Sequence, residues 1–282
     1  MRKFAIVTAA GSGTRLGFGV PKALVEVNGQ TILALALERL PQLDGLVISA
    51  PASHLEVFRE IASQIRNLGH YSPEMFVEVV SGGDSRQGSV ACALAALGER
   101  AAPVQDDDLV VVHDAARCLT PTAVFDRVFN ALESGAEAVI PAQPVADTIK
   151  IATGDYVTQE NLAITAKYGS DGQNPPSCVK DGSSNPNLST SESAKKPEFV
   201  ESTLDRARLR AVQTPQGFRL KSLLELHTNF AARAADESRA FGDDAGMAEE
   251  AGITVGIVPG DDLAFKITRP LDLQFATCLL TP

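Results

Sequence analysis

A glycine-rich segment with two flanking cations lies close to the N-terminus. It reads Ala9-Ala10-Gly11-Ser12-Gly13-Thr14-Arg15-Leu16-Gly17, and Pro21-Lys22 follows. Gly11 and Gly13 allow the backbone to approach a ligand closely and to turn its N–H groups toward phosphate oxygens. Arg15 would add a planar fork of donors, and Lys22 a point charge. We therefore predict that the phosphates of a ligand lie between Ala9 and Lys22.

This loop differs from two widespread phosphate-binding motifs. No Gly-Lys-Ser/Thr follows its glycines, so it is not a Walker A motif. Gly17 lies one residue too far along the chain for the dinucleotide-binding fingerprint. Because glycine pairs after a first strand are common, the prediction depends on the two cations. The alternative is that Arg15 and Lys22 are ordinary surface residues near a turn.

Small and acidic residues follow the apolar run Phe76–Val80. They are Gly82-Gly83-Asp84, and Ser89 comes shortly after them. In open parallel sheets, ligands bind outside the carboxyl ends of the strands. Glycines at such an end admit a flat base, and Asp84 and Ser89 have polar atoms that suit the edge of a pyrimidine. The alternative for Ser89 is a buried hydroxyl within a helix.

His113-Asp114 follows the most apolar run of the chain, Leu109–Val112. A carboxylate at this end of a strand suits Mg²⁺ held between phosphates, because Mg²⁺ prefers one or two carboxylates together with phosphate oxygens. We therefore predict Asp114 as the metal ligand. The alternative is that Asp114 only pairs with Arg117. For His113 we predict a packed side chain rather than a general base.

Short apolar runs alternate with longer segments of helical character, which predicts a single Rossmann-like, doubly wound, mostly parallel α/β sheet over residues 1–282. The predicted strands are Phe4–Thr8, Leu46–Ser49, Phe76–Val80, Leu109–Val112, Ala138–Pro141 and Ile253–Val258. The predicted helices are Thr31–Leu40, Ser53–Leu68, Arg86–Leu97, Thr120–Ser134, Leu220–Ala235 and Ala245–Ala251.

Residues at the ends of these segments favour helix capping. Thr120 is the predicted N-cap of its helix, with Pro121 at the first helical position and Gly135 just past the last turn. Thr31 and Ser53 are predicted to cap their helices in the same way.

The composition indicates a globular protein that does not bind nucleic acid. The 282 residues carry a formal net charge of −10, and nucleic-acid binders depend on Lys and Arg to neutralise phosphates. No stretch approaches the roughly 20 apolar residues that span a bilayer, and the run Phe4–Val7 is too short for a signal sequence. We therefore expect a cytoplasmic protein without membrane contact. The four cysteines are scattered, which predicts neither a zinc site nor a disulfide framework.

One segment departs from the pattern of alternating strands and helices. Residues from about 167 to 197 are rich in Ser, Asn, Gly, Pro and Lys, so they have little to bury and predict a disordered insertion. The flanking segments Asp147–Val157 and Glu198–Leu204 have strand-like composition. We expect them to pair as a projecting β-arm over about 147–206. Because such an arm has unpaired edges, we expect it to close against a second subunit in a homodimer.

Several separated motifs together carry a resemblance to a known family. Besides the glycine-rich loop with Pro21-Lys22, they are Gly82-Gly83-Asp84-Ser85-Arg86, Ser89, Val112-His113-Asp114-Ala115-Ala116-Arg117, Thr214-Pro215-Gln216 and Lys266-Ile267-Thr268-Arg269-Pro270. The loop resembles the signature of the sugar-phosphate nucleotidyltransferase superfamily. The full set resembles the 2-C-methyl-D-erythritol 4-phosphate cytidylyltransferase family, over nearly the whole chain apart from roughly residues 160–197.

The resemblance implies a role for each matching residue. The backbone of Ala9 and Ala10 would recognise cytosine together with Gly82, Asp84 and Ser89. The implied catalytic residues are Arg15 and Lys22, which would act at the triphosphate of CTP, and Arg206 and Lys266, which would act at the acceptor phosphate.

Thr148 and Arg206 would bind the acceptor phosphate across the dimer interface, with Arg208 and Arg210 as nearby rivals to Arg206. The chain departs from the family pattern Asp-Asn-Ile-Lys, since Leu263-Ala264-Phe265 precedes Lys266. Asp261 and Asp262 are the nearest acids, and we select Asp262 as the substrate-binding one. Asp243-Asp244 resembles an acidic helix start of the family, for which we predict a structural role.

The implied reaction is transfer of CMP from CTP to a sugar-alcohol phosphate with release of pyrophosphate, assisted by Mg²⁺. A phosphate monoester is largely dianionic at neutral pH, its second pKa being about 6, so this nucleophile needs no general base. One alternative is a cytidylyltransferase for another polyol phosphate such as ribitol 5-phosphate. A remoter alternative is a non-catalytic nucleotide-binding protein on the same scaffold.

Overall fold

The computed structural model describes residues 1–11, 13, 16, 18–69, 71–156, 198–236 and 238–281. The chain divides into two compact units. The first, here the main unit, comprises Met1–Gln143 and Arg210–Pro282, and the second, here the arm unit, comprises Pro144–Leu209. The predicted disordered insertion at about 167–197 lies outside the described residues.

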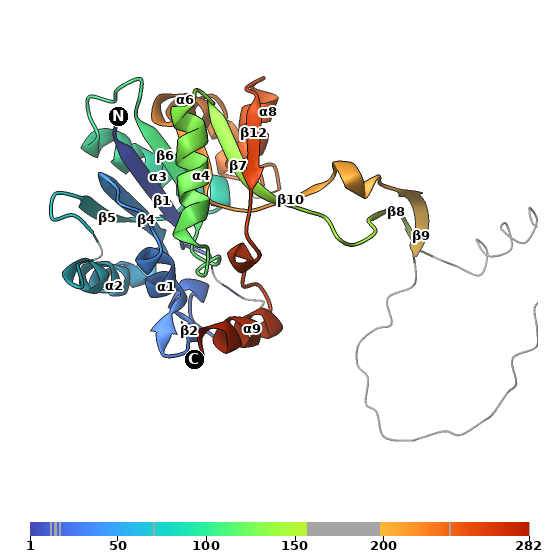
Figure 1. Cartoon of the computed structure of the whole chain (residues 1–282), viewed down its shortest axis with the longest axis horizontal. Coiled ribbons are helices and arrows are strands. Elements are labelled where there is room, and N and C mark those ends of the chain that lie inside the picture. Colours follow the sequence, from blue (N-terminus) through green and yellow to red (C-terminus); the bar gives the residue numbers. More distant parts are fainter. Residues whose placement is uncertain are drawn as a thin grey trace, which may run out of the picture. The chain divides into compact units, whose positions relative to one another are not determined.

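An eight-stranded mixed sheet forms the centre of the main unit (Figure 1). Its strand order is β10-β7-β11-β6-β1-β4-β5, and β12 also pairs with β7. Strands β4, β1 and β6 run parallel to one another, as do β4 with β5 and β7 with β12, whereas β11 is antiparallel to β6 and β7. The strands are β1 (Lys3–Thr8), β4 (Gly45–Ala50), β5 (Phe76–Ser81), β6 (Leu109–Asp114), β7 (Ala138–Pro144), β10 (Arg210–Val212), β11 (Gln216–Arg219) and β12 (Val255–Pro259).

Helices cover both faces of this sheet. Along β1, Ala5 and Val7 belong to one hydrophobic core, and Phe4 and Ile6 to the other, because successive side chains of a strand point to opposite faces. Helices α1, α2 and α4 pack into the first core, and α3, α6 and α8 into the second. The helices are α1 (Ile32–Glu38), α2 (Leu55–Asn67), α3 (Arg86–Arg100), α4 (Thr122–Glu133), α6 (Leu220–Asn229), α7 (Ala231–Ala234), α8 (Asp244–Glu250) and α9 (Pro270–Leu280).

This architecture confirms the prediction of a doubly wound, mostly parallel α/β sheet, and the six predicted strands coincide with β1, β4, β5, β6, β7 and β12. Strands β10 and β11 and helix α9 were not predicted. A short hairpin of β2 (Glu26–Val27) and β3 (Gln30–Thr31) was also missed. It turns at Asn28-Gly29, both with positive φ, which is the turn chemistry that a tight hairpin requires.

The predicted helix Leu220–Ala235 is interrupted. Helix α6 ends at Asn229, and α7 begins at Ala231. The residue between them, Phe230, leaves the helical conformation and packs edge-on against Phe241 with 5.1 Å between ring centroids. The helix is therefore interrupted where the Phe230 ring packs against Phe241. The periodicity of apolar residues in the sequence does not indicate this interruption.

Two of the five capping predictions are confirmed. The Thr31 hydroxyl accepts a hydrogen bond from the Ala34 N–H at 3.1 Å, so it caps α1. Gly135 follows the last residues of α4 with φ +108°, a conformation that glycine adopts without strain.

The other three capping predictions, for Thr120, Pro121 and Ser53, are wrong. Helix α4 begins at Thr122 with Pro121 at the N-cap, because the Thr120 hydroxyl donates to the Arg117 carbonyl of the preceding turn at 2.7 Å. Ser53 lies inside a 3₁₀ turn, Ala52–His54, ahead of α2, and its hydroxyl contacts His54 Nδ1 at 2.8 Å.

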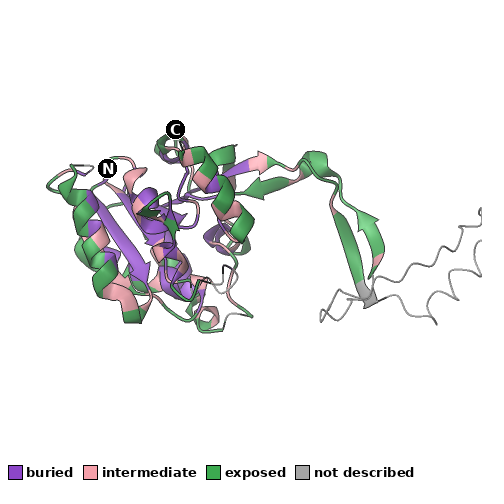
Figure 2. Cartoon of the chain, turned by 90° about the horizontal axis from the view of Figure 1, so that it is seen from below, coloured by how far each residue is buried: buried purple, intermediate pink, exposed green. Residues whose placement is uncertain are grey.

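The arm unit contains two antiparallel strands, β8 (Lys150–Tyr156) and β9 (Glu198–Thr203). Pairs such as Lys150–Thr203 and Ile151–Ser202 confirm the predicted pairing, and the register shifts further along the ribbon. Exposed residues predominate along β9, as Figure 2 shows. A 3₁₀ turn, Arg206–Arg208, follows β9, and the Asp205 side chain caps it.

None of the helices that the structure describes combines the length and the apolar character needed to cross a membrane.

Candidate active site

A cavity of about 470 Å³ lies in the main unit at the carboxyl ends of β1, β5 and β6, a volume typical of sites for small ligands. In open α/β sheets this is the edge at which ligands bind. Residues from four distant parts of the chain line the cavity: Thr8, Ala9, Ala10, Gly11, Lys22, Ala23, Gly83, Asp84, Ser85, Arg86, Ser89, Asp114, Ala115, Ala116 and Lys266. The fold therefore brings together most of the residues that the motifs singled out.

Two glycines allow the walls of this cavity to approach closely. Gly13 has φ +68°, and a Cβ atom there would lie 2.7 Å from Lys22 Cβ. At Gly82 an added Cβ would lie 2.4 Å from Ala10 Cβ and 2.9 Å from Ser89 Oγ. Neither position has room for a side chain, so both glycines are required by packing. Of the predicted loop residues, Arg15 lies outside the described residues.

Lys22 begins a short 3₁₀ helix, Lys22–Leu24, beside the loop. Its ammonium group donates to the Ile267 carbonyl at 3.2 Å, one residue after Lys266. The cation predicted for the triphosphate thus contacts the segment that carries the cation predicted for the acceptor phosphate.

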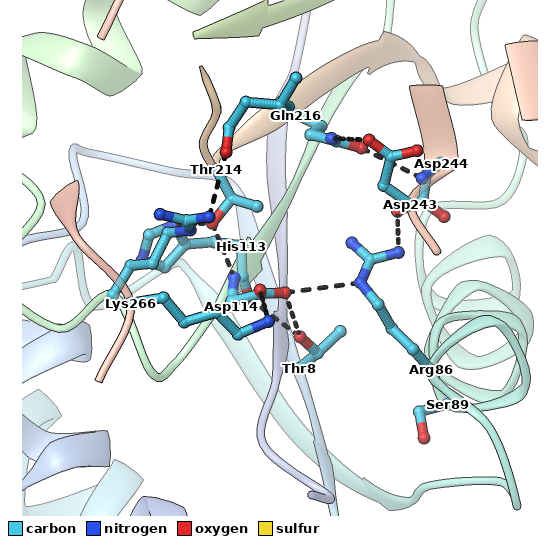
Figure 3. A network of polar contacts seen from close by, with 12 residues as sticks. Thr8, Arg86, Ser89, His113, Asp114, Thr214, Gln216, Asp243, Asp244 and Lys266 are labelled. Atoms are coloured by element: carbon cyan, nitrogen blue, oxygen red, sulfur yellow. Dashed lines mark hydrogen bonds and ion pairs between the residues drawn. The ribbon is translucent and has the colours of Figure 1, made fainter. Parts of the chain in front are cut away.

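Asp114 is the centre of the polar network drawn in Figure 3. The Lys266 ammonium group donates to its Oδ2 at 2.7 Å. Its Oδ1 accepts from the Thr8 hydroxyl at 3.1 Å and lies 3.5 Å from Arg86 Nε. The backbone N–H of Asp114 donates to the Thr214 hydroxyl at 3.0 Å. Two cations and the Thr8 hydroxyl therefore hold this carboxylate, and the Thr214 hydroxyl holds the Asp114 backbone at the end of β6.

Asp114 is only 6% exposed and yet remains ionised. Burial by itself raises the pKa of this carboxyl, but Arg86 and Lys266 outweigh burial and hold the pKa well below its usual range. The alternative, that Asp114 only pairs with Arg117, is wrong. The Arg117 guanidinium instead donates to the carbonyls of Ala264 and Val212 at 2.7 Å and 3.1 Å.

His113 is a packed histidine, as predicted. Its Nδ1 lies 3.0 Å from the Thr214 hydroxyl, and its ring packs 4.9 Å from the Phe125 ring. Burial lowers the pKa of His113 to about 4, against the opposing effect of Asp114. The imidazole is therefore neutral at pH 7.

The two residues predicted to bind the edge of the base differ in exposure. Ser89 is buried, and its hydroxyl donates to the carbonyls of Ser85 and Gly83 at 2.9 Å and 3.3 Å. It is thus a buried helix hydroxyl, as the alternative stated, and it also lines the cavity. Its role at a base stays a prediction. Asp84 lines the same wall and is exposed.

The remaining predicted residues are not among those that line the cavity. Asp262 is exposed in the 3₁₀ turn Asp262–Ala264, and Asp261 caps that turn by accepting from the Leu263 N–H at 2.9 Å. Thr148 and Arg206 belong to the arm unit and are exposed. Arg206 donates to the Ala146 carbonyl at 2.6 Å. The roles of these three residues at an acceptor phosphate stay predictions.

Sequence reasoning missed two residues of the site, Thr8 and Arg86. Thr8 ends β1, and Arg86 begins α3 directly after the motif Gly82–Ser85. A signal for Arg86 was present, since it is a cation adjacent to a glycine motif, but its partners lie far away in the sequence.

The cavity suits a divalent cation that arrives with a phosphate ligand. Within the described ranges, no cluster of three or more His, Cys, Asp or Glu side chains is placed to hold a metal ion by itself. Asp114 offers one carboxylate, with the Thr8 hydroxyl beside it. Mg²⁺ is held by one or two carboxylates and completes its shell with water and phosphate oxygens, so this donor set fits it.

Comparison with known proteins assigns the family. The model of the family described as IspD, 2-C-methyl-D-erythritol 4-phosphate cytidylyltransferase, matches residues 4–163 and 185–282. A protein of that name from Streptomyces avermitilis is 38% identical, with 99% of this chain and 92% of that protein covered. Another from Saccharopolyspora erythraea is also 38% identical, with 99% of this chain and 100% of that protein covered.

Solved structures support the same assignment of the fold. The 4-diphosphocytidyl-2C-methyl-D-erythritol synthase of Anaerococcus prevotii superposes with a TM-score of 0.69 at 23% identity, with coverage of 99% of this chain and 96% of that chain. The cytidylyltransferase of Thermus thermophilus superposes with a TM-score of 0.60 at 25% identity, over 99% of this chain and 98% of that one. With the motifs gathered at one cavity and relatives matched over nearly their full length, the chain belongs to the 2-C-methyl-D-erythritol 4-phosphate cytidylyltransferase family.

Proposed function

We propose that this protein transfers CMP from CTP to 2-C-methyl-D-erythritol 4-phosphate and releases pyrophosphate, a step of isoprenoid biosynthesis by the non-mevalonate pathway. The membership of the family supports this reaction. The observation that carries it is the cavity at which the glycine-rich loop, Lys22, Asp114 and Lys266 meet.

The reaction joins two anions in line. A phosphate oxygen of the acceptor forms a bond to the α-phosphorus of CTP, and the bond from that phosphorus to the oxygen bridging to the β-phosphate breaks. Pyrophosphate leaves with that electron pair. Since the attacking phosphate is already ionised, positioning and charge stabilisation replace proton transfer. This agrees with a neutral, packed His113 and with the cations Lys22 and Lys266 on the cavity wall.

The base would lie against the wall formed by Ala9, Ala10, Gly83, Asp84 and Ser89. The closeness of Ala10 to Gly82 leaves a narrow surface without projecting side chains, which suits a flat ring. Backbone groups of Ala9 and Ala10 would then select cytosine.

Mg²⁺ is part of the proposal. Asp114 would hold the ion with help from Thr8, and the ion would neutralise charge on the triphosphate. Lys22, and Arg15 by resemblance, would bind the triphosphate.

The acceptor phosphate would bind Lys266 of one subunit and Thr148 and Arg206 of a second. This arrangement requires a homodimer built through the arm unit. The exposed apolar side chains of the arm, Ile151 and Val200, support burial of the arm against a second subunit, because a two-stranded ribbon is marginally stable alone.

From the composition we also expect that the protein is located in the cytoplasm.

A direct test compares acceptors. The protein is incubated with CTP and Mg²⁺ and with either 2-C-methyl-D-erythritol 4-phosphate or ribitol 5-phosphate, and pyrophosphate release is followed. We expect kcat/KM to be at least about 100-fold higher for the first acceptor, because a polar pocket rejects a ligand that leaves its groups unpaired. Preference for ribitol 5-phosphate would reassign the acceptor. CTP binding without pyrophosphate release would indicate a nucleotide-binding protein instead.

A further inference from the structure

A chain of alternating charges extends from the cavity to side chains of α3, α8 and α6. Figure 3 shows its members from Lys266 to Asp244. Lys266 pairs with Asp114, Asp114 with Arg86, Arg86 with Asp244, and Asp244 with His227. The cavity end of this chain belongs to the proposed reaction. The other members, Arg86, Asp244 and His227, have no role in the proposed reaction.

Arg86 links the two carboxylates in this chain of charges, because it forms an ion pair with both Asp114 and Asp244. Its Nη1 donates to Asp244 Oδ2 at 2.8 Å, and its Nε lies 3.5 Å from Asp114 Oδ1. Burial lowers the pKa of Arg86, but Asp244 and Asp114 together raise it above its ordinary value, so the guanidinium stays charged. A planar guanidinium with two edges can serve two carboxylates at once, which an ammonium group cannot do in fixed geometry.

Asp244 is held more firmly than a surface acid at a helix start. It is fully buried at the first turn of α8, and His227 Nε2 lies 3.0 Å from its Oδ1. The N–H groups of Asp244 and Ala245 both lie within hydrogen-bond distance of Gln216 Oε1, at 3.1 Å and 3.2 Å. Gln216 belongs to β11, which pairs with β6, the strand that ends in Asp114. Both acids are therefore anchored to neighbouring strands of one sheet.

This anchoring matters because Lys266 has two tasks. In the structure it pairs with Asp114 at 2.7 Å, but the reaction requires it at the acceptor phosphate. Its side chain is 39% exposed, so it can turn toward a ligand. When it leaves, Asp114 keeps Arg86 as a side-chain cation on its other oxygen, independently of the Mg²⁺ that arrives with CTP. A buried carboxylate without such a partner would be costly to keep ionised.

We propose that Arg86, clamped by Asp244, is a positioning residue that holds Asp114 in place while Lys266 transfers from Asp114 to the acceptor phosphate. The inference rests on the proposed function. Without Arg86, Lys266 would be the remaining side-chain cation paired with Asp114, beside the Mg²⁺ that CTP brings, and it would be retained there more strongly. Loss of the clamp should therefore weaken the acceptor site more than the CTP site.

The test uses the full-length protein and measures acceptor KM, CTP KM, kcat and the Kd for CTP without divalent cation. In Arg86→Gln we expect acceptor KM to rise about tenfold, because the ion pair between Arg86 and Asp114 is lost. The Kd for CTP should change less than about twofold. Arg86→Lys should restore part of the acceptor KM, since its single charge can reach one carboxylate only. A matched control is Arg59→Gln, which removes an exposed arginine paired with Glu56 on α2.

Arg86→Gln leaves Asp244 buried beside a neutral partner, so it can fail to fold. The double variant Arg86→Gln/Asp244→Asn removes both charges together and leaves similar shapes. It should show the same rise in acceptor KM at a melting temperature close to that of the wild type.

Two results would overturn the inference. A weakening of CTP binding equal to that of the acceptor would mean that Arg86 contacts the triphosphate itself, for which its buried Nη2, without a partner among the described residues, would be the donor. An unchanged acceptor KM in the folded double variant would mean that Arg86 is only structural. A wild-type protein that binds CTP but releases no pyrophosphate would instead contradict the proposed function.

Discussion

The cavity of the main unit and the arm unit differ in how firmly each holds its polar residues. Around the cavity, Asp114 is 6% exposed and makes contacts to groups from four distant segments of the chain. In the arm, Thr148 and Arg206 are exposed, and Val200 is 61% exposed. The half of the site proposed for CTP is thus preorganised by the core of one chain. The arm residues proposed for the acceptor, Thr148 and Arg206, would be positioned only when a second subunit packs against the arm.

The largest effect is expected where the cavity provides charge for the transition state. Lys22→Ala should lower kcat by about 1000-fold, because an ammonium group near the triphosphate counts most when charge develops on the transferring group. The fold should persist, since Lys22 is not part of either hydrophobic core. Pyrophosphate release under saturating substrates provides the measurement. Lys221→Ala, which removes an exposed lysine paired with Asp106, is the matched control. Equal activity of both variants would exclude the assignment of Lys22.

A smaller and more selective effect is expected in the arm. Arg206→Ala should raise acceptor KM by roughly 10- to 100-fold, the loss of one charged hydrogen bond, and leave CTP binding unchanged. Separate titrations of the two substrates measure this. Arg208→Ala, in the same 3₁₀ turn, is the control. If Arg208→Ala gave the larger effect, the acceptor would be bound by Arg208, and the alignment of the arm would shift accordingly.

The stability of the main unit should depend on pH through His113. Its pKa in the folded protein is about 4, against an ordinary value near 6.5, because burial disfavours the charged form. The unfolded chain therefore binds this proton first as pH falls. Its contribution to stability is complete above about pH 6.5 and decreases down to about pH 4, by roughly 3 kcal/mol in total.

Chemical denaturation between pH 7.5 and pH 4.5 measures this dependence. His113→Asn keeps a polar atom near Thr214 but cannot titrate, so its stability should fall less steeply with acid than that of the wild type. His54→Asn, in the 3₁₀ turn before α2, is the control and should keep the wild-type slope. Parallel slopes for wild type and His113→Asn would contradict the assignment.

The smallest effect is expected in the insertion. Deletion of about residues 170–195 should change the melting temperature by less than about 2 °C, because a segment of this composition has little to bury and loop length alters closure entropy only slightly. Differential scanning calorimetry at fixed protein concentration measures it. A drop of many degrees would show that the segment packs against the rest of the protein.

Much of the fold could be predicted because buried parallel strands are continuous apolar runs. Leu109–Val112 and Phe4–Thr8 are clear examples, and both lie at the centre of the sheet. Strand β11 (Gln216–Arg219) escaped prediction because it is short and mixed in polarity. It becomes a strand only because β6 and β7 offer it hydrogen-bond partners on both sides.

The candidate site also has a part that the sequence predicts and a part that it does not. By itself the sequence determined which residue types were available for phosphates, a base and a metal, because glycines, cations and acids at strand ends have few other uses in combination. Only the tertiary structure decided the pairing of Asp114 with Lys266 and of Arg86 with Asp244, which lie 152 and 158 residues apart. Ion pairs of this separation leave no local pattern, because they arise from strands and helices brought together by burial of their apolar faces.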